Sequence, residues 1–257
     1  MSAESRPCNI EKFADALASV LKSERGGRGI GTLGEKTLHA VLKNYFEPNA
    51  ANHEIKVGGF VADIVNDNGV TEIQTRSFDR LKRKLSAFLE LAPVTVVCPV
   101  VREKQLIWLD PETGEMSKKR KSPKSGRPAD ALFELCRIHE FIGHKNLTVC
   151  ILMLDCEEYR IKNGYANDGK RGSTRYERIP TALCEEIYLS EKSDYTELLP
   201  SALPDSFTAA DFRRAVRFGG MSASFALKML CELGICEKTG QRGRAYIYER
   251  KDKKHGN

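Results

Sequence analysis

The chain has 257 residues, of which 41% are hydrophobic and 30% charged, and it carries a formal net charge of +6. This composition is typical of a soluble globular protein with one large or two ordinary domains, and it excludes a disordered chain. The longest apolar runs have about eight residues, against the roughly 20 of a membrane-spanning helix, and the N-terminus lacks the apolar core of a signal peptide, so we expect a cytoplasmic protein without membrane contact.

Hydrophobic periodicity predicts the elements of the first half of the chain. Helical spacing predicts helices from Ile10 to near Gly26, over residues 32–46 and over residues 76–91. Between the second and third helices, alternating apolar residues predict strands over residues 53–57, 60–65 and 70–75. The sequence Asp67-Asn68-Gly69 between the last two strands is typical of a tight hairpin turn.

The second half of the chain has longer apolar runs and more loops. Residues 94–101 and 147–154 predict strands buried on both faces, and a further strand is predicted at 105–109. Residues 129–141 have helical spacing, whereas residues 118–128 and the Gly-rich, basic residues 163–176 are predicted to be surface loops. Helices on either side of a mixed sheet predict an α/β domain over residues 1–200, with a second domain over residues 201–257.

One acidic residue lies where a charge is costly. On a helical projection of residues 32–46, Glu35 lies within about 20° of Leu42 and Phe46, in the middle of the apolar stripe. A glutamate that points toward a core is rare unless it is paired or binds a metal ion. A partly exposed acid at the start of the helix is the alternative interpretation.

Asp63 and Glu72 face each other across the predicted hairpin. They pair directly if residues 67 and 68 form the turn, and they are diagonal neighbours if residues 68 and 69 do. In both registers the carboxylates lie within roughly 5–8 Å and repel each other, a conflict that a divalent cation removes. A few oxygen ligands open to water suit magnesium or manganese better than zinc. Such Asp–Glu neighbours also occur on solvated sheet faces, so the spacing alone leaves a structural interpretation open.

The order of these residues carries a resemblance. Gly34-Glu35 on a helix is followed by Asp63 closing a strand, by Glu72-Ile73-Gln74 on the next strand, and by another helix. This order resembles the PD-(D/E)XK nuclease superfamily, in particular its Holliday-junction-resolvase-like branch, over about residues 31–101. The resemblance implies a restriction-endonuclease-like mixed sheet flanked by helices. It also implies that Asp63, Glu72 and the carbonyl of Ile73 hold Mg²⁺ or Mn²⁺, and that Glu35 completes or orients the metal shell.

Gln74 departs from the pattern of the superfamily, because most members have lysine there to position or polarise the attacking water. A glutamine hydrogen-bonds a water molecule but supplies no positive charge to the transition state. By the resemblance Gln74 is the fourth catalytic residue, and Lys82 or Lys84 on the following helix is the alternative source of charge. His39 follows Glu35 by one helical turn, and a packed histidine is the interpretation we favour over one that reaches the site.

The positive charge of the chain lies near the C-terminus. Residues 206–257 hold 11 Lys and Arg against 5 Asp and Glu, whereas the preceding residues hold 30 of each sign, so a polyanion is the expected partner. Thr208 and Asp211 have the spacing of a capping box that opens a helix, and Gly219-Gly220 is the turn before a second helix capped by Ser222. Residues 235–238 and 244–249 then predict two strands.

Helix, turn, helix and hairpin in this order resemble the winged helix-turn-helix family. The resemblance implies DNA contacts from the second helix and from the wing. The residues expected to make them are Ser222, Ser224, Phe225, Lys228, Arg242 and Arg244. A winged helix that mediates protein contacts is the alternative.

Together these features predict a metal-dependent DNA endonuclease with a C-terminal DNA-docking domain. A homodimer is expected if one site per chain cuts both strands. The main alternative is a non-catalytic DNA-binding regulator whose nuclease-like domain has lost activity, with Gln74 as the trace of that loss. A third interpretation is a small-molecule or protein-binding domain tethered to DNA, and magnesium-dependent cleavage separates the first interpretation from the other two.

Overall fold

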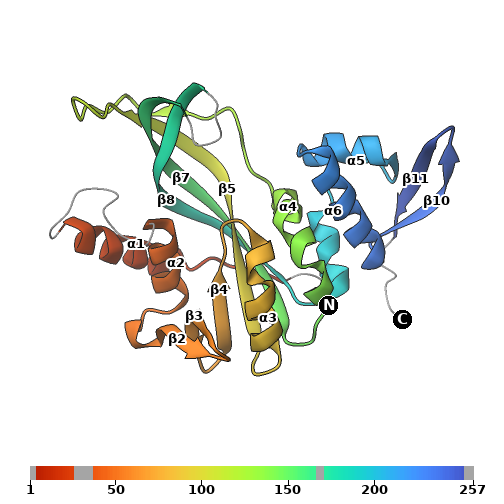
Figure 1. The fold of residues 1–257 in the computed structure, drawn as a ribbon, viewed down its shortest axis with the longest axis horizontal. Coiled ribbons are helices and arrows are strands. Elements are labelled where there is room, and N and C mark those ends of the chain that lie inside the picture. The colour runs from red at the N-terminus through yellow and green to blue at the C-terminus, as the bar shows by residue number, and fades with distance from the viewer. Residues whose placement is uncertain (1–3, 26–36, 166–170, 252–257) are drawn as a thin grey trace.

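A computed structural model describes residues 4–25, 37–165 and 171–251 of the chain. An eight-stranded sheet is flanked by helices, which confirms the predicted mixed α/β class (Figure 1). The strand order is β1-β8-β7-β5-β4-β3-β2, and β6 pairs with β5. β5 is parallel to β4 and to β7, and the other neighbours are antiparallel. No helix in these ranges is long and apolar enough to span a membrane.

Two N-terminal helices cover one face of the sheet. α1 (Ile10–Arg25) and α2 (Thr37–Phe46) follow the edge strand β1 (Glu4–Arg6), and the predicted start of the second helix, residues 32–36, lies outside the described residues. Phe13 of α1 and Leu42 of α2 belong to a buried cluster with Val97 and Leu152 of the sheet.

A second core lies on the opposite face of the sheet. Phe78, Leu85 and other side chains of the following helices pack there with Val96 and Ile151. Because successive strand residues point to opposite faces, the apolar run at 94–97 serves both cores.

A three-stranded meander carries the predicted carboxylates. After the short 3₁₀ helix η1 (Ala50–Asn52), β2 (His53–Val57), β3 (Phe60–Asn66) and β4 (Gly69–Ile73) pair in sequence, close to the prediction. The predicted helix over residues 76–91 is instead a 3₁₀ helix, η2 (Phe78–Leu81), followed by α3 (Lys82–Leu89). Ser77 has a left-handed backbone (φ 59°), which prevents a regular helix from starting at residue 76.

Two strands are much longer than predicted, and a third, β8, was not predicted. β5 (Val94–Leu109) joins two predicted strands through a bulge between Val101 and Glu103. β7 (Leu147–Tyr165) and β8 (Arg171–Leu189) occupy most of residues 163–176, so the prediction of a surface loop there was wrong. Within the predicted loop at 118–128, β6 (Arg120–Lys121) pairs with β5. Beyond the bulge, residues 103–121, 155–165 and 171–182 form a twisted extension that we call the arm, which extends past the helices in Figure 1.

Ion pairs explain why the strands of the arm were missed. The carboxylate of Glu158 is 1% exposed and accepts hydrogen bonds from Lys104, Arg160 and Arg178 at 3.2, 2.7 and 2.9 Å. Cross-strand charge pairs stabilise a sheet as apolar pairs do. A strand held in this way has no alternation of apolar and polar residues, so its sequence reads as a polar loop.

The C-terminal part has a small sheet of its own. In order along the chain it contains β9 (Ser206–Thr208), α5 (Ala209–Val216), α6 (Gly220–Glu232), β10 (Cys236–Arg242) and β11 (Ala245–Arg250). The strand order is β10-β11-β9, and β9 was not predicted because three residues give no period. The predicted capping box is formed, since the backbone N–H of Asp211 donates to Thr208 Oγ1 at 3.3 Å and that of Thr208 donates to Asp211 Oδ2 at 3.0 Å.

The C-terminal part packs on the short helices that precede it. These are η3 (Pro128–Ala131), α4 (Leu132–Leu135), η4 (Cys136–Phe141) and η5 (Lys192–Leu198). The rings of Phe133 and Phe218 meet edge to face with centroids 5.6 Å apart, and Arg250 Nη2 donates to the carbonyl of Pro200 at 3.0 Å. One apolar cluster runs from Leu85 to Phe212 across the predicted boundary at residue 200. The division into two domains stays a prediction.

Candidate functional site

The β3–β4 hairpin brings Asp63 and Glu72 together. Asn66 pairs with Gly69 and Ile64 with Thr71, so residues 67 and 68 form the turn, which is the first of the two predicted registers. Carried one residue further, this register puts Asp63 opposite Glu72. The two residues are linked through the backbone, since Asp63 N donates to Glu72 Oε1 at 3.2 Å and Ile73 N donates to Asp63 Oδ2 at 2.7 Å.

Both carboxylates are shielded from water, to different degrees. The side chain of Glu72 is 2% exposed and that of Asp63 is 20% exposed. Burial and the neighbouring charge of Asp63 raise the pKa of Glu72, although Lys84 opposes the shift. Burial also acts to raise the pKa of Asp63, but hydrogen bonds from His39 and the Ile73 amide outweigh it, and the pKa of Asp63 is lowered. The surroundings therefore favour the ionised form of Asp63 and oppose that of Glu72.

His39 reaches this pair from α2. Its Nε2 lies 3.2 Å from Asp63 Oδ2 and 3.2 Å from the carbonyl oxygen of Ile73. Because both of these atoms are acceptors, Nε2 must carry the proton. The favoured prediction of a packed histidine away from the site was wrong, since α2 crosses the end of β4 at this residue.

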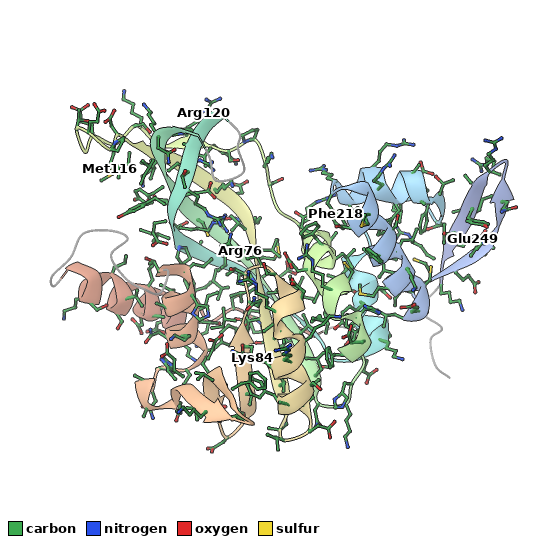
Figure 2. The ribbon with its side chains drawn as sticks, viewed as in Figure 1. Arg76, Lys84, Met116, Arg120, Phe218 and Glu249 are labelled. Atoms are coloured by element: carbon green, nitrogen blue, oxygen red, sulfur yellow. The ribbon has the colours of Figure 1, made fainter. Side chains whose placement is uncertain are left out.

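Of the two lysines on α3, Lys84 and not Lys82 contacts the carboxylate pair. Lys84 Nζ on α3 donates to both oxygens of Glu72, at 3.0 and 2.9 Å, whereas Lys82 pairs with Glu140. Figure 2 labels Lys84 on α3, below Arg76. The start of α3 at residue 82, instead of 76, determines which of the two lysines faces the hairpin.

Gln74 does not join the cluster through any hydrogen bond in the described residues. Its Nε2 donates to the carbonyl of Arg76 at 2.6 Å and lies 3.5 Å from that of Ser77, so the amide supports the loop after β4. Glu35, the third predicted metal ligand, lies outside the described residues. Within the ranges that the structure describes, no three or more His, Cys, Asp or Glu side chains gather as a metal site.

The predicted DNA-contacting residues lie on α6 and on the β10–β11 hairpin. Ser222 does not cap α6, because the helix begins at Gly220 with Gly219 in an extended conformation as its N-cap. Ser224 donates to the carbonyl of Gly220 at 3.0 Å. Lys228 is exposed and lies 3.6 Å from Glu232. The remaining predicted residues, Phe225, Arg242 and Arg244, are also exposed.

A pocket beside the carboxylates was missed by the sequence analysis. It has a volume of about 290 Å³ and lies between α2, the end of β4 and the arm. Its lining residues are Leu38, His39, Thr75, Arg76, Arg175, Tyr176, Glu177 and Arg178. The signal for it was the segment 175–178, in which two arginines flank a tyrosine and a glutamate, but the prediction of a loop gave those side chains no common face.

Two comparisons with known proteins give matches. Residues 36–190 match the family described as a domain of unknown function (DUF8091), a range that contains Asp63, Glu72, Lys84 and the whole pocket. Over 228 residues the chain is 31% identical to an uncharacterized protein of Treponema pallidum (strain Nichols), which spans 86% of this chain and 87% of that protein. No solved structure gives a significant match. The chain belongs to the DUF8091 family.

Proposed function

We propose that this protein is a metal-dependent DNA endonuclease. In this proposal α2, the β2–β4 meander, α3 and β5 are a PD-(D/E)XK nuclease core, and residues 206–250 are a winged helix that docks DNA. The observation that carries the proposal is the pairing of Asp63 and Glu72 at one end of the hairpin, with Lys84 and His39 in contact with them.

The order of elements supports the nuclease core. A helix, three antiparallel strands, a second helix and a strand parallel to the third follow one another from Thr37 to Val101. This is the order in which the sequence resemblance puts Asp63 and the Glu72-Ile73-Gln74 segment. The match between this order of elements and the order expected from the resemblance supports the assignment of Asp63 and Glu72 to the nuclease motif.

The donor set fits a hard divalent cation. Two carboxylates and the carbonyl of Ile73 are oxygen ligands, and Glu72 is buried beside a like charge, an arrangement that a cation stabilises. Bound magnesium or manganese would polarise a phosphoryl oxygen and lower the pKa of a water molecule. Asp63, Glu72 and Ile73 would hold the ion.

The other side chains of the site have separate roles in this proposal. His39 orients Asp63, because its N–H is shared between the carboxylate and the Ile73 carbonyl. Lys84 opposes the rise in the pKa of Glu72 and brings a positive charge near the developing phosphorane, the charge that Gln74 does not supply. Gln74 supports the loop that leads to the pocket.

The C-terminal part supports docking to DNA by its shape and charge. α5 and α6 are followed by a two-stranded hairpin, and β9 completes a three-stranded sheet. Arg242 and Arg244 are exposed at the end of that hairpin, and Lys228 is exposed on α6. Lysines and arginines in such positions neutralise phosphates.

A non-catalytic DNA-binding regulator is the second candidate. It is favoured by the Lys84 ammonium, which satisfies both oxygens of Glu72 without a metal ion, and by Gln74, whose amide is turned to the loop. If the protein is such a regulator, Glu72 and Lys84 form an ion pair with a structural role only.

Cleavage of DNA by the full-length protein tests the proposal. We expect magnesium or manganese to support cleavage, EDTA to prevent it, and Asp63→Asn to remove it without loss of folding, since asparagine still accepts the Ile73 hydrogen bond. Asp67→Asn, which changes an exposed acid in the turn of the same hairpin, is the matched control. Equal cleavage by Asp63→Asn and wild type would overturn the proposal, and absence of cleavage with tight DNA binding would favour the regulator.

A further inference from the structure

The pocket beside the carboxylate pair is strongly cationic. Three arginines line it, Arg76, Arg175 and Arg178, together with one acidic residue, Glu177. The carboxylate of Glu177 is buried and accepts the backbone N–H of Arg178 at 2.7 Å. Arg178 pairs with Glu158, but that single carboxylate is shared with two other cations. A pocket with this surplus of positive charge favours an anion.

Two of the arginines have no hydrogen-bonded or ion-paired side-chain partner within the part of the chain that the structure describes. In the described ranges, neither Arg76 nor Arg175 makes a side-chain hydrogen bond or an ion pair. Arg175 is half-buried, and burial together with the charges of Arg178 and Arg76 lowers its pKa, whereas Glu158 opposes the shift. An anion with several acceptor oxygens, such as a phosphate, would satisfy both guanidinium forks.

The rest of the lining is not suited to a bare ion. Leu38 and the ring of Tyr176 give the pocket apolar and aromatic surface, on which a planar base can pack or stack. A volume of about 290 Å³ is at the lower limit for small-ligand pockets. A pocket of this size suits a ligand no larger than about one nucleotide better than a base pair.

The pocket shares a wall with the candidate catalytic groups. His39 lines the pocket and contacts both Asp63 and the carbonyl of Ile73, and Thr75 and Arg76 continue directly from β4. Figure 2 shows Arg76 where the arm leaves the main sheet, close to the α3 helix that carries Lys84. A nucleotide in the pocket therefore has its adjoining phosphodiester next to the carboxylate pair.

We propose that this pocket binds a single unpaired nucleotide of the substrate strand, with Arg76 and Arg175 on its phosphate and Tyr176 and Leu38 against its base. This inference rests on the proposed nuclease function and specifies its substrate. The protein cuts strands that offer an unpaired nucleotide, at an end, a flap or a single-stranded segment, in preference to a continuous duplex.

Binding of a mononucleotide to the full-length protein tests the pocket without cleavage. Deoxyadenosine 5′-monophosphate, deoxyadenosine and inorganic phosphate would be titrated in EDTA by calorimetry. We expect the mononucleotide to bind most tightly, and Arg76→Gln and Arg175→Gln each to weaken it by about tenfold or more, because each removes a charge-assisted hydrogen bond. Arg76 is exposed, so its substitution leaves the fold intact even if Arg175→Gln does not.

The control is Arg120→Gln, an exposed arginine at the far end of the arm from Arg76 in Figure 2, which we expect to leave mononucleotide binding unchanged. The inference is overturned if the mononucleotide does not bind, if inorganic phosphate binds as tightly, or if both pocket variants bind it like wild type. A magnesium-dependent activity that prefers intact duplex would also overturn it while leaving the nuclease proposal standing. Mononucleotide binding with no cleavage of any DNA would instead remove the nuclease proposal and retain the nucleotide site.

Discussion

The ammonium group of Lys84 donates hydrogen bonds to both carboxylate oxygens of Glu72, at 3.0 and 2.9 Å, from a helix that starts nine residues after the hairpin strand ends. Glu72 is almost fully buried and lies beside the carboxylate of Asp63. Without Lys84, the two carboxylates would lie together, and of the described lysine and arginine side chains none would donate to either of them. Lys84 therefore stabilises the ionised form of Glu72 in the absence of a metal ion and supplies a positive charge at the site.

The first prediction concerns this lysine. Lys84→Met should lower the rate of DNA cleavage by about 10²-fold, because a charge directed at the reacting phosphoryl group is lost. The measurement is the single-turnover rate on a labelled oligonucleotide at saturating magnesium. Since one partner of a buried ion pair is removed, thermal unfolding should be followed in parallel.

Lys82→Met is the matched control, because Lys82 lies on the same helix and pairs with the exposed Glu140. It should cleave at the rate of wild type. Equal losses in the two variants, or no loss in Lys84→Met, would show that Lys84 has no special role in the reaction.

The second prediction joins Gln74 and Lys84. Gln74→Lys, which introduces the lysine that the superfamily motif usually has, should keep or raise the rate in the wild-type background. In the Lys84→Met background it should restore part of the lost rate, because the positive charge returns from the strand instead of the helix. A double variant as slow as Lys84→Met would indicate that residue 74 does not face the reacting groups, consistent with the hydrogen bond of Gln74 to the loop.

Local spacing was sufficient to predict the hairpin that carries the site. The side-chain period of a strand and the short turn left two registers, and both brought Asp63 and Glu72 to one face. Sequence spacing was not sufficient to assign the lysine. The left-handed backbone at Ser77 and the 3₁₀ turn after it shift the phase of the helix, and that shift decides between Lys82 and Lys84.

The arm shows why a polar strand is hard to predict. β8 was missed because its outer half is held by ion pairs between residues distant in the sequence, such as Arg178 with Glu158. Apolar periodicity carries no information about such pairs. For the same reason the pocket was missed, since its arginines come from β8 and from the loop after β4, and only the folded chain brings these together.

The third prediction concerns the stability of the arm. Burial acts against the ionised form of Glu158, but hydrogen bonds and charges from Arg178, Lys104 and Arg160 lower its pKa from an ordinary 4.5 to about 2. A lowered pKa in the folded state means that the stabilisation is present above pH 4.5 and is lost as the pH falls toward 2. Glu158→Gln should therefore lower the free energy of unfolding by about 3 kcal/mol at neutral pH, as a shift of this size and the breaking of a buried ion pair both indicate.

Urea unfolding at several pH values measures this difference. The gap between wild type and Glu158→Gln should narrow below pH 4.5 and disappear near pH 2. Glu103→Gln, which removes a 43% exposed carboxylate paired with Lys121 in the same arm, should cost less than about 1 kcal/mol. A gap for Glu158→Gln that is independent of pH would mean that lost packing, not lost charge, causes the destabilisation.

The last prediction tests DNA docking by the hairpin of β10 and β11. Arg242 and Arg244 are exposed at its end. The hairpin lies on the opposite side of the molecule from α1 in Figure 1. If each arginine neutralises one phosphate, its replacement by glutamine should weaken binding to duplex DNA and make the log–log dependence of affinity on salt shallower by about 0.9. Full-length protein carrying Asp63→Asn would be titrated with DNA in EDTA from about 50 to 200 mM salt.

Lys22→Gln removes one positive charge from an exposed position on α1 and is the control for net charge alone. It should leave the salt dependence unchanged, because a distant charge releases no counterion from the contacted phosphates. Lys228→Ala should weaken binding to one DNA sequence more than to others if α6 enters the major groove, since a lysine there contacts base edges as well as phosphates. If the dependence of affinity on salt is the same for wild type, Arg242→Gln and Arg244→Gln, the β10–β11 hairpin is excluded from the DNA interface. The exposed Phe225 and Met221 of α6 would then favour a protein partner for the C-terminal part.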